Sequence, residues 1–276
     1  MHALYTFLIA IAVLSAMPRN AQAELYVTQV DISGDAFVSE YNATTGALIN
    51  FQFLTVGGLP RALALSDNTL FVANGPVGAY NATTGAVIKA DFIRGVDNSN
   101  GLAVSDNTLF VANFDPGTVG AYDATTGKVI KADLITGLHN PQGLAVTGNT
   151  LFVSNPPTGT VGKYNATTGH KIKAHFITAV PIPTGLALSG NTLFVADLRH
   201  GTIGTYNATT GAVIKADFIR GLSGPQELAL SGNTLFVVNT GNETVGKYDA
   251  TTGGAINAGF ITELSGPFAI AVKSAK

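Results

Sequence analysis

The sequence predicts an all-β fold, a six-bladed β-propeller with four antiparallel strands in each blade. The first indication is a turn of sequence Asn/Asp-Ala-Thr-Thr-Gly, which follows a tyrosine six times at intervals of 39, 42, 42, 42 and 42 residues. The second is that each interval contains four short apolar or β-branched segments bounded by turn residues. No apolar pattern of helical period persists for ten residues, so helices are excluded. The tyrosines are Tyr41, Tyr80, Tyr122, Tyr164, Tyr206 and Tyr248.

One repeat, residues 143–177, contains the four expected strands in order. The first, Gly-Leu-Ala-Val (143–146), has small apolar side chains that suit the narrow space around a propeller axis. Leu-Phe-Val-Ser (151–154) and Thr-Val-Gly-Lys-Tyr (160–164) follow. The Asn-Ala-Thr-Thr-Gly turn then closes a hairpin, because Asn can bond the backbone ahead of it and Gly supplies a left-handed residue. The outermost strand is predicted at 171–177.

Charged residues recur on the predicted outermost strands. The outermost strand of a blade has a free edge, and lysine or aspartate there discourages pairing with another chain. We therefore interpret these charges as protection of the edge and not as a binding patch. They are Lys89, Lys131, Lys173, Lys215, Asp91, Asp133 and Asp217.

The two ends of the repeat region are complementary. Residues 25–27 (Leu-Tyr-Val) form a second-strand sequence without its first strand, and residues 268–272 (Phe-Ala-Ile-Ala-Val) form a first strand without its successor. Together they complete one blade. We predict that the N- and C-terminal strands close the ring in this shared blade.

The first 23 residues have the pattern of a signal peptide. An apolar run at 3–14 precedes Ala21-Gln22-Ala23, a small-x-small cleavage sequence. An uncleaved membrane anchor is the alternative. We predict a signal peptide at 1–23 and a propeller at 24–276, in a secreted, periplasmic or cell-surface protein that has no membrane span after cleavage.

Composition excludes several classes of protein. The 276 residues are 46% hydrophobic and only 12% charged, which is incompatible with disorder. There is no cysteine, so disulfide scaffolds and thiol chemistry are excluded. A formal net charge of −2 provides no basic field for nucleic acid.

The repeat also resembles a known class. The stretch Asn-Thr-Leu-Phe-Val-Ala-Asn, followed by Pro-Gln-Gly-Leu-Ala-Val, is similar to the NHL and YVTN families of β-propeller repeats. The resemblance covers about 24–272. It implies the propeller fold, but these families include surface-layer proteins, interaction platforms and a few enzymes, so it does not choose an activity.

Candidate binding residues are those that differ between copies. Antiparallel strand order places the crossings between blades and the turns between second and third strands at one end of the ring, around the mouth of the central channel. We expect ligand or protein binding there, because rigidly held loops carry most binding sites. The candidates at the mouth and its rim are Arg61, Asn100, Phe114, Gln142, Arg199, His200, Gln226 and Phe268.

One layer of the innermost strands suggests an alternative, a metal site. The aligned residues are Ala62, Gly101, Gly143, Gly185, Glu227 and Ala269, so Glu227 is the exception. Side-chain oxygens of Glu227, Asp197, Asn155 and Asn113 are of the type that holds Ca²⁺ or Mg²⁺. The pattern is similar to the metal site of the six-bladed gluconolactonase and senescence-marker family. The alternative to a metal site is a structural role for the Asn and Asp residues, because Asn or Asp at the end of a strand can cap the next turn.

The sequence favours a non-catalytic binding or interaction module that requires no cofactor. It is expected to be a monomer that binds a protein, a small molecule or a glycan, and no nucleic acid. The first alternative is a hydrolase or lactonase that uses Ca²⁺ or Mg²⁺ in the central channel. The second is a structural component of the cell envelope.

Overall fold

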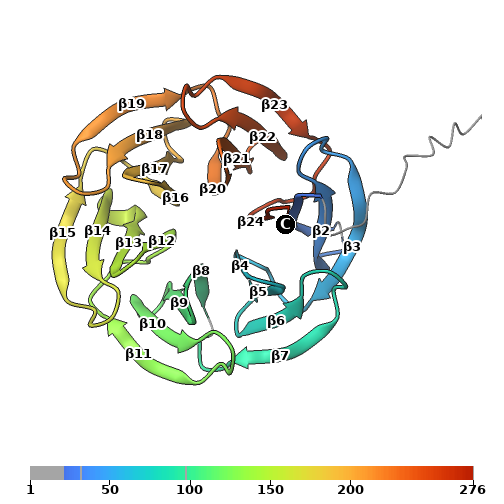
Figure 1. Cartoon of the computed structure of the whole chain (residues 1–276), viewed down its shortest axis with the longest axis horizontal. Coiled ribbons are helices and arrows are strands. Elements are labelled where there is room, and N and C mark those ends of the chain that lie inside the picture. The colour runs from blue at the N-terminus through green and yellow to red at the C-terminus, as the bar shows by residue number, and fades with distance from the viewer. Residues whose placement is uncertain (1–21, 32, 97, 276) are drawn as a thin grey trace, which may run out of the picture.

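The computed structural model describes residues 22–275 except 32 and 97, and in this part of the chain six four-stranded antiparallel sheets surround a central axis (Figure 1). The predicted six-bladed β-propeller is therefore confirmed. Successive sheets along the chain are called blades 1 to 6, and in each blade the chain runs from the innermost strand outward. Blade 1 is the exception, because its innermost strand comes from the C-terminus.

The first three blades have the following strands, in order from the axis outward. Blade 1 contains β24 (Ile270–Lys273), β1 (Glu24–Val30), β2 (Ala36–Asn42) and β3 (Leu48–Val56). Blade 2 contains β4 (Ala62–Ser66), β5 (Thr69–Ala73), β6 (Val77–Asn81) and β7 (Val87–Ile93). Blade 3 contains β8 (Ser99–Ser105), β9 (Thr108–Asn113), β10 (Thr118–Asp123) and β11 (Val129–Ile135).

The second half of the ring repeats this pattern. Blade 4 contains β12 (Leu144–Thr147), β13 (Thr150–Asn155), β14 (Thr160–Asn165) and β15 (Lys171–Ile177), with a short 3₁₀ turn at Pro156–Thr158. Blade 5 contains β16 (Pro183–Ser189), β17 (Thr192–Asp197), β18 (Thr202–Asn207) and β19 (Val213–Ile219). Blade 6 contains β20 (Pro225–Ser231), β21 (Thr234–Asn239), β22 (Thr244–Asp249) and β23 (Ala255–Ile261).

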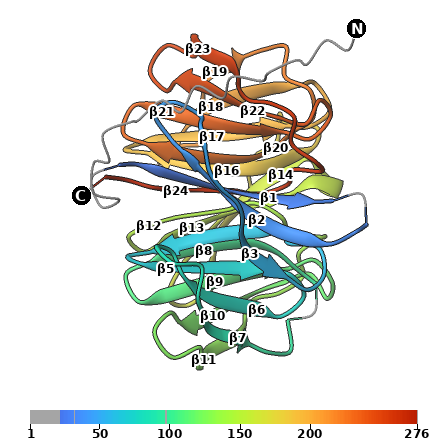
Figure 2. The ribbon, with the colours of Figure 1, turned by 90° about the vertical axis from the view of Figure 1, so that its right-hand side faces the viewer.

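Blade 1 closes the ring as predicted. Strand β24 pairs antiparallel with β1, with Leu25 opposite Val272 and Val27 opposite Ile270. The two strands lie side by side in both views of the ribbon (Figures 1 and 2). A partly buried ion pair between Lys273 Nζ and Glu24 Oε2, at 2.9 Å, joins the ends of the two strands.

The hydrophobic core lies between the blades. Each of six apolar clusters joins side chains of two neighbouring blades, so the core is a ring and not a single centre. Second strands of sequence Leu-Phe-Val are buried on both faces; Leu70, Phe71 and Val72 of β5, for example, are fully buried. The small share of charged residues and the large share of apolar residues in the sequence follow from this arrangement, because most strands face another blade on both sides.

The repeated turns gather at one end of the ring, called the hairpin end. In blade 2, Asn81 Oδ1 accepts hydrogen bonds from the N–H groups of Thr83 and Thr84, both at 2.9 Å. Gly85 then has a φ of +72°, and a Cβ on it would overlap the carbonyl oxygen of Phe53 in blade 1. Glycine is required here both for the left-handed conformation and for the close approach of two blades.

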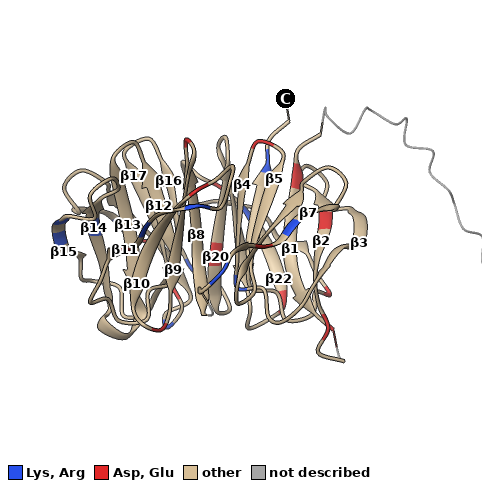
Figure 3. Cartoon of the chain, turned by 90° about the horizontal axis from the view of Figure 1, so that it is seen from below, with Lys and Arg blue, Asp and Glu red and all other residues tan. Residues whose placement is uncertain are grey.

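Charged residues are sparse along the strands (Figure 3). The described part of the chain contains no helix long and apolar enough to cross a membrane. The predicted signal peptide at 1–23 lies outside the described residues apart from positions 22 and 23, so it stays a prediction.

Candidate functional site

The end of the ring opposite the hairpin end, called the mouth end, is built from the crossings between blades and the turns between second and third strands. These two kinds of segment bond to each other. Leu138 N donates to Gly117 O at 3.0 Å, and Leu222 N donates to Gly201 O at 2.9 Å. The predicted division of the turns between two ends is therefore present in the structure.

The hairpin end has few side chains free for a ligand in its repeated turns. A threonine hydroxyl of the turn bonds an asparagine of the first hairpin in the same blade, as between Thr83 and Asn68 at 2.6 Å. The same bond recurs in blades 3 to 6 at 2.6–2.8 Å. The polar residues that recur in every copy thus hold the turns, which leaves blade-specific residues as the functional candidates.

Four of the predicted binding residues meet on one side of the mouth end. The guanidinium carbon of Arg61 in blade 2 lies 5.7 Å from the ring centroid of Phe268 in blade 1. Arg61 also lines a cavity of about 200 Å³ together with Asn100 and Phe114 of blade 3. We call Arg61, Asn100, Phe114 and Phe268 the mouth cluster.

The cavity of the mouth cluster offers complementary chemistry. Phe114 is 43% exposed although it is a large apolar side chain, and its N–H is fixed to Asn98 O at 2.9 Å. Asn100 is buried, and its Oδ1 accepts no hydrogen bond from any described residue. Arg61 forms no ion pair with a described acidic side chain. The site therefore presents a cation, an apolar ring and an unused acceptor on rigid strand ends.

Sequence reasoning missed two members of this cavity, Asn98 and Asp115, as binding residues. Asp115 was visible as part of the blade-specific sequence Phe-Asp-Pro at 114–116, in a turn whose sequence differs between copies. Asp115 adds an acidic residue to the lining of the cavity that Arg61 also lines.

Arg199 and His200 lie in blade 5, opposite blade 2 across the ring, so the structure does not join them to the mouth cluster (Figure 1). His200 Nδ1 lies 2.9 Å from Asp197 Oδ2, and Arg199 N donates to Asp197 Oδ1 at 3.0 Å. Asp197 thus caps the turn that follows β17. Gln142 of blade 4 and Gln226 of blade 6 align in the repeat with Arg61 and Asn100, but they lie in other blades.

The residues of the predicted metal site lie in four different blades. Asn113 Nδ2 donates to Thr118 Oγ1 at 3.1 Å, and Asn155 Nδ2 lies 3.5 Å from Val153 O. The Oδ1 atoms of both residues are buried without a described donor. Across the described residues, no group of three or more His, Cys, Asp or Glu side chains could hold a metal ion. The metal site stays a prediction whose four residues have mainly local partners.

Glu227 has an unusual environment for a carboxyl group. It occupies the β20 position where the other five blades have Gly or Ala, and its Oε1 accepts a hydrogen bond from Leu228 N at 3.1 Å. Burial raises the pKa of Glu227 to about 7, although the bond from Leu228 opposes this shift. Near neutral pH the group is therefore partly protonated.

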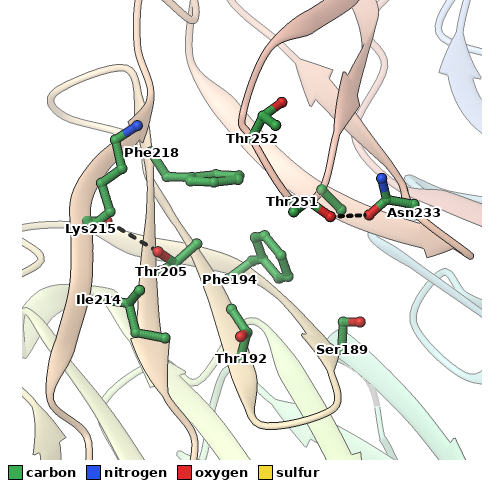
Figure 4. Close-up of a pocket in the computed structure, with 11 residues that line it drawn as sticks. Ser189, Thr192, Phe194, Thr205, Ile214, Lys215, Phe218, Asn233, Thr251 and Thr252 are labelled. Atoms are coloured by element: carbon green, nitrogen blue, oxygen red, sulfur yellow. Dashed lines mark hydrogen bonds between the residues drawn. The ribbon is translucent and has the colours of Figure 1, made fainter.

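The central channel itself is apolar. A cavity of about 310 Å³ is lined by three residues of each innermost strand, all of them Leu, Ala, Val or Ile. A larger cavity, of about 420 Å³, lies between blades 5 and 6 near the hairpin end (Figure 4). Sequence reasoning missed this groove, although its signal was present: the residue after the glycine of the third strand is Lys163 in blade 4, Thr205 in blade 5 and Lys247 in blade 6.

Comparison with known proteins supports the fold. A family model described as outer membrane protein assembly factor BamB matches residues 12–175. A search of curated proteins found no match. A crystal structure of a nidogen/laminin complex is similar with a TM-score of 0.78 and 14% identity, over 92% of this chain and 99% of that one. The designed protein Ika8 is similar with a TM-score of 0.50 and 20% identity, over 87% and 71%.

These similarities in structure establish the propeller architecture alone. The resemblance to NHL and YVTN repeats is matched at the level of a β-propeller repeat family, and the finer assignment stays a prediction.

Proposed function

Because this chain belongs to the β-propeller family described as outer membrane protein assembly factor BamB, we propose that it is an exported, non-catalytic module that binds a partner protein through the mouth cluster. The leader-like sequence at 1–23 supports export. The similar nidogen propeller, whose crystal structure is of a complex with laminin, supports protein binding as a use of this architecture.

The mouth cluster is the observation that carries the proposal. Exposed aromatic rings and arginine are the side chains that dominate binding energy at protein interfaces. Phe114 and Arg61 have this character, and both are attached to strand ends in the ring of blades. A partner therefore meets a surface that loses little conformational entropy on binding.

The chemistry of the cluster defines the segment that fits it. A carboxylate would pair with Arg61, an apolar side chain would cover Phe114, and an N–H or O–H group would satisfy Asn100 Oδ1. A short acidic loop with an adjacent aromatic or aliphatic residue supplies all three. Asp115 at the edge of the cavity would disfavour a second carboxylate, which limits the segment to one acidic group at this point.

A selection from a random peptide library tests this proposal. Peptides selected on the wild-type protein should contain one acidic residue next to an apolar one, and Arg61→Ala and Phe114→Ala should each weaken their binding at least tenfold. Arg199→Ala, which changes a rim arginine in blade 5, is the matched control and should bind as the wild type does. Peptides that bind the Arg61 and Phe114 variants with unchanged affinity would show that the mouth cluster is not the binding surface.

The alternative function as a Ca²⁺- or Mg²⁺-dependent hydrolase depends on Glu227 and Asp197. These carboxylates lie in neighbouring blades, and Asp197 is engaged by its own turn. A metal site there would make the wild-type protein more stable to heat in millimolar Ca²⁺, and Glu227→Gln would lose the effect. An equal melting temperature with Ca²⁺ and with chelator, in both proteins, favours the binding module. A purely structural role would leave the variants in Arg61 and Phe114 without any effect on binding.

A further inference from the structure

A cavity of about 420 Å³ lies in a groove between blades 5 and 6, and the same groove recurs between other pairs of blades. At the hairpin end, the third strand of one blade faces the Ala-Thr-Thr turn of the next. In the 5–6 groove these parts are Thr205 on β18 and the turn residues Ala250 and Thr251 (Figure 4). Two aromatic rings, Phe194 and Phe218, form the wall between them, with centroids 5.7 Å apart.

The equivalent groove between blades 4 and 5 holds a lysine of the chain itself. Lys163 takes the position of Thr205, and its Nζ donates to Ala208 O at 2.9 Å and to Thr209 O at 3.2 Å. The same Nζ lies 5.7 Å from the centroid of Phe152 and 4.9 Å from that of Phe176. Two turn carbonyls and two phenyl faces therefore cradle one ammonium group.

The groove between blades 6 and 1 repeats this geometry. Lys247 Nζ donates to Ala43 O at 3.0 Å and to Thr44 O at 3.1 Å. It lies 5.7 Å from the centroid of Phe236 and 4.6 Å from that of Phe260. Because two independent copies place an ammonium at the same point, the cradle has a defined ligand chemistry.

The turn carbonyl is satisfied by a donor in a third groove as well. Between blades 1 and 2, the hydroxyl of Tyr26 donates to Ala82 O, the counterpart of Ala208 O. Between blades 5 and 6, no described side chain donates to the carbonyl oxygen of Ala250 or Thr251. Thr205 is too short to reach them, and its hydroxyl lies 3.4 Å from Lys215 O instead.

We propose that the groove between blades 5 and 6 is a binding site for an unbranched primary alkylammonium group, presented as a lysine side chain by a partner protein. The ammonium donates to Ala250 O and Thr251 O and lies against Phe194 and Phe218, as Lys163 and Lys247 do in their own grooves. The methylene chain lies in the cavity of about 420 Å³ beside Thr205.

Carbonyl dipoles and aromatic faces are the groups that hold the charge in this cradle. Burial lowers the pKa of Lys163 and of Lys247, in keeping with a site that contains no carboxylate. The two carbonyls require N–H donors, so a primary ammonium is preferred over a quaternary one. A neutral alcohol of the same length lacks the cation–π contribution.

Lys215 also lines the groove and does not exclude a second cation. Its Nζ lies 5.6 Å from the centroid of Phe218, and it donates no hydrogen bond to a described residue of the blade 6 turn (Figure 4). Lys173 occupies the same position in blade 4, opposite Lys163 in the strand register, as Lys215 is opposite Thr205. Blade 4 therefore carries lysine at both register positions, and Lys163 is the one whose Nζ reaches the turn of blade 5. Lys215→Ala should strengthen binding of an external ammonium by removing the nearest like charge.

The other short residues at this position lie in different surroundings. Between blades 3 and 4 the residue is Ala121, but Leu134 replaces the second phenylalanine and Lys131 Nζ already donates to Thr168 O at 3.2 Å. Between blades 2 and 3 the residue is Ala79, beside the pair Phe71 and Phe92. A test must therefore localise binding to the 5–6 groove.

The experiment uses n-butylammonium, which reproduces the lysine side chain, on the full-length protein. We expect a saturable rise of about 2 °C in the melting temperature and a saturation-transfer NMR signal from its methylene groups. Sodium chloride at equal ionic strength, butan-1-ol and n-butyltrimethylammonium should give neither effect. Nα-acetyl-lysine amide distinguishes the two sources of the ligand: binding supports a lysine side chain, and binding of n-butylammonium alone overturns that part of the proposal.

Two variants localise the site. Thr205→Lys should fold, since lysine occupies this position in blades 4 and 6, should raise the melting temperature, and should abolish the response to n-butylammonium. Thr202→Lys adds the same charge at the mouth end of β18 and should keep the response. Lys163→Ala should create a second responsive groove between blades 4 and 5. A response that persists in Thr205→Lys, or a wild-type response equal to that with sodium chloride, overturns the proposal.

Discussion

Gly85 at the hairpin end and Gly95 at the mouth end have nearly the same backbone conformation, with φ of +72° and +73°. A Cβ on Gly85 would overlap Phe53 O of the neighbouring blade, whereas a Cβ on Gly95 would meet no atom within 4 Å. Gly127 and Gly137 repeat the contrast in blade 3. The turn glycines of the hairpin end therefore lie against the neighbouring blade, whereas Gly95 and Gly137 in the crossings at the mouth end do not.

The two ends also differ in how far their polar side chains are satisfied by hydrogen bonds. At the hairpin end, Asn81 and Thr83 bond their own turn and first hairpin, and their counterparts do so in the other copies. At the mouth end, Asn100 keeps an unused acceptor and Phe114 stays exposed. Function is therefore expected where the copies differ, either at the mouth or at a groove such as that of Thr205.

The largest expected effect comes from breaking the ring on which both ends depend. Deletion of residues 266–276 removes β24 and exposes the edge of β1, so the protein should be insoluble or unfolded. Circular dichroism and solubility measure this. Deletion of only 274–276, beyond the last strand, should leave the melting temperature nearly unchanged. A soluble protein with an unchanged melting temperature after the longer deletion would contradict the closure of blade 1.

The two glycines give the next largest effect and test the comparison directly. Gly85→Ala should lower the free energy of unfolding by roughly 3 kcal/mol, because it combines left-handed strain with a clash against Phe53 O. Gly95→Ala has the strain without the clash and should cost about 1 kcal/mol. Urea denaturation measures both values. Equal losses of unfolding free energy in the two variants would show that the contact of Gly85 with Phe53 O adds nothing to the backbone strain.

Glu227 predicts a pH dependence that originates at the mouth end. Its pKa is raised from 4.5 to about 7 in the folded protein, so folding favours the protonated carboxyl. Stability contributed by this group is therefore lost as the pH rises from about 4.5 to about 7, by roughly 3 kcal/mol in total. Glu227→Gln should remove this decline in denaturant titrations at pH 5 and pH 8. Glu263→Gln, at an exposed site, should retain it.

The mouth cluster should contribute least to stability. Arg61→Ala and Phe114→Ala remove exposed side chains, so each should change the free energy of unfolding by no more than about 0.5 kcal/mol. Their effect on peptide binding should nevertheless be tenfold or more. A loss of stability above 2 kcal/mol would assign these residues to the fold instead.

Most of the fold could be predicted because it is encoded locally and repeated. The Asn/Asp-Ala-Thr-Thr-Gly turn, the Leu-Phe-Val strands and the divided blade at the two chain ends each follow from short-range chemistry or from counting copies. Repetition also predicted which residues lie at the mouth, since a common register fixes Arg61, Asn100 and Phe268 at one level.

Contacts between blades could not be predicted in this way. The guanidinium carbon of Arg61 lies 5.7 Å from the ring centroid of Phe268 because the last strand of the chain lies beside blade 2. No local sequence pattern predicts this contact between the two side chains. The sequence shows threonine in blade 5 at a position where blades 4 and 6 have lysine. Its meaning appears only when Lys163 and Lys247 are seen reaching across to the next blade.

The sequence by itself determined the number of blades, the turns and the closure of the ring, because these depend on backbone conformation and on hydrophobic periodicity within each copy. The tertiary structure decided the environment of the residues that differ between the copies, such as Glu227 and Thr205. Burial at the mouth raises the pKa of Glu227, and the approach of blades 5 and 6 forms a cavity of about 420 Å³ beside Thr205. Both are properties of space between blades, which no single repeat contains.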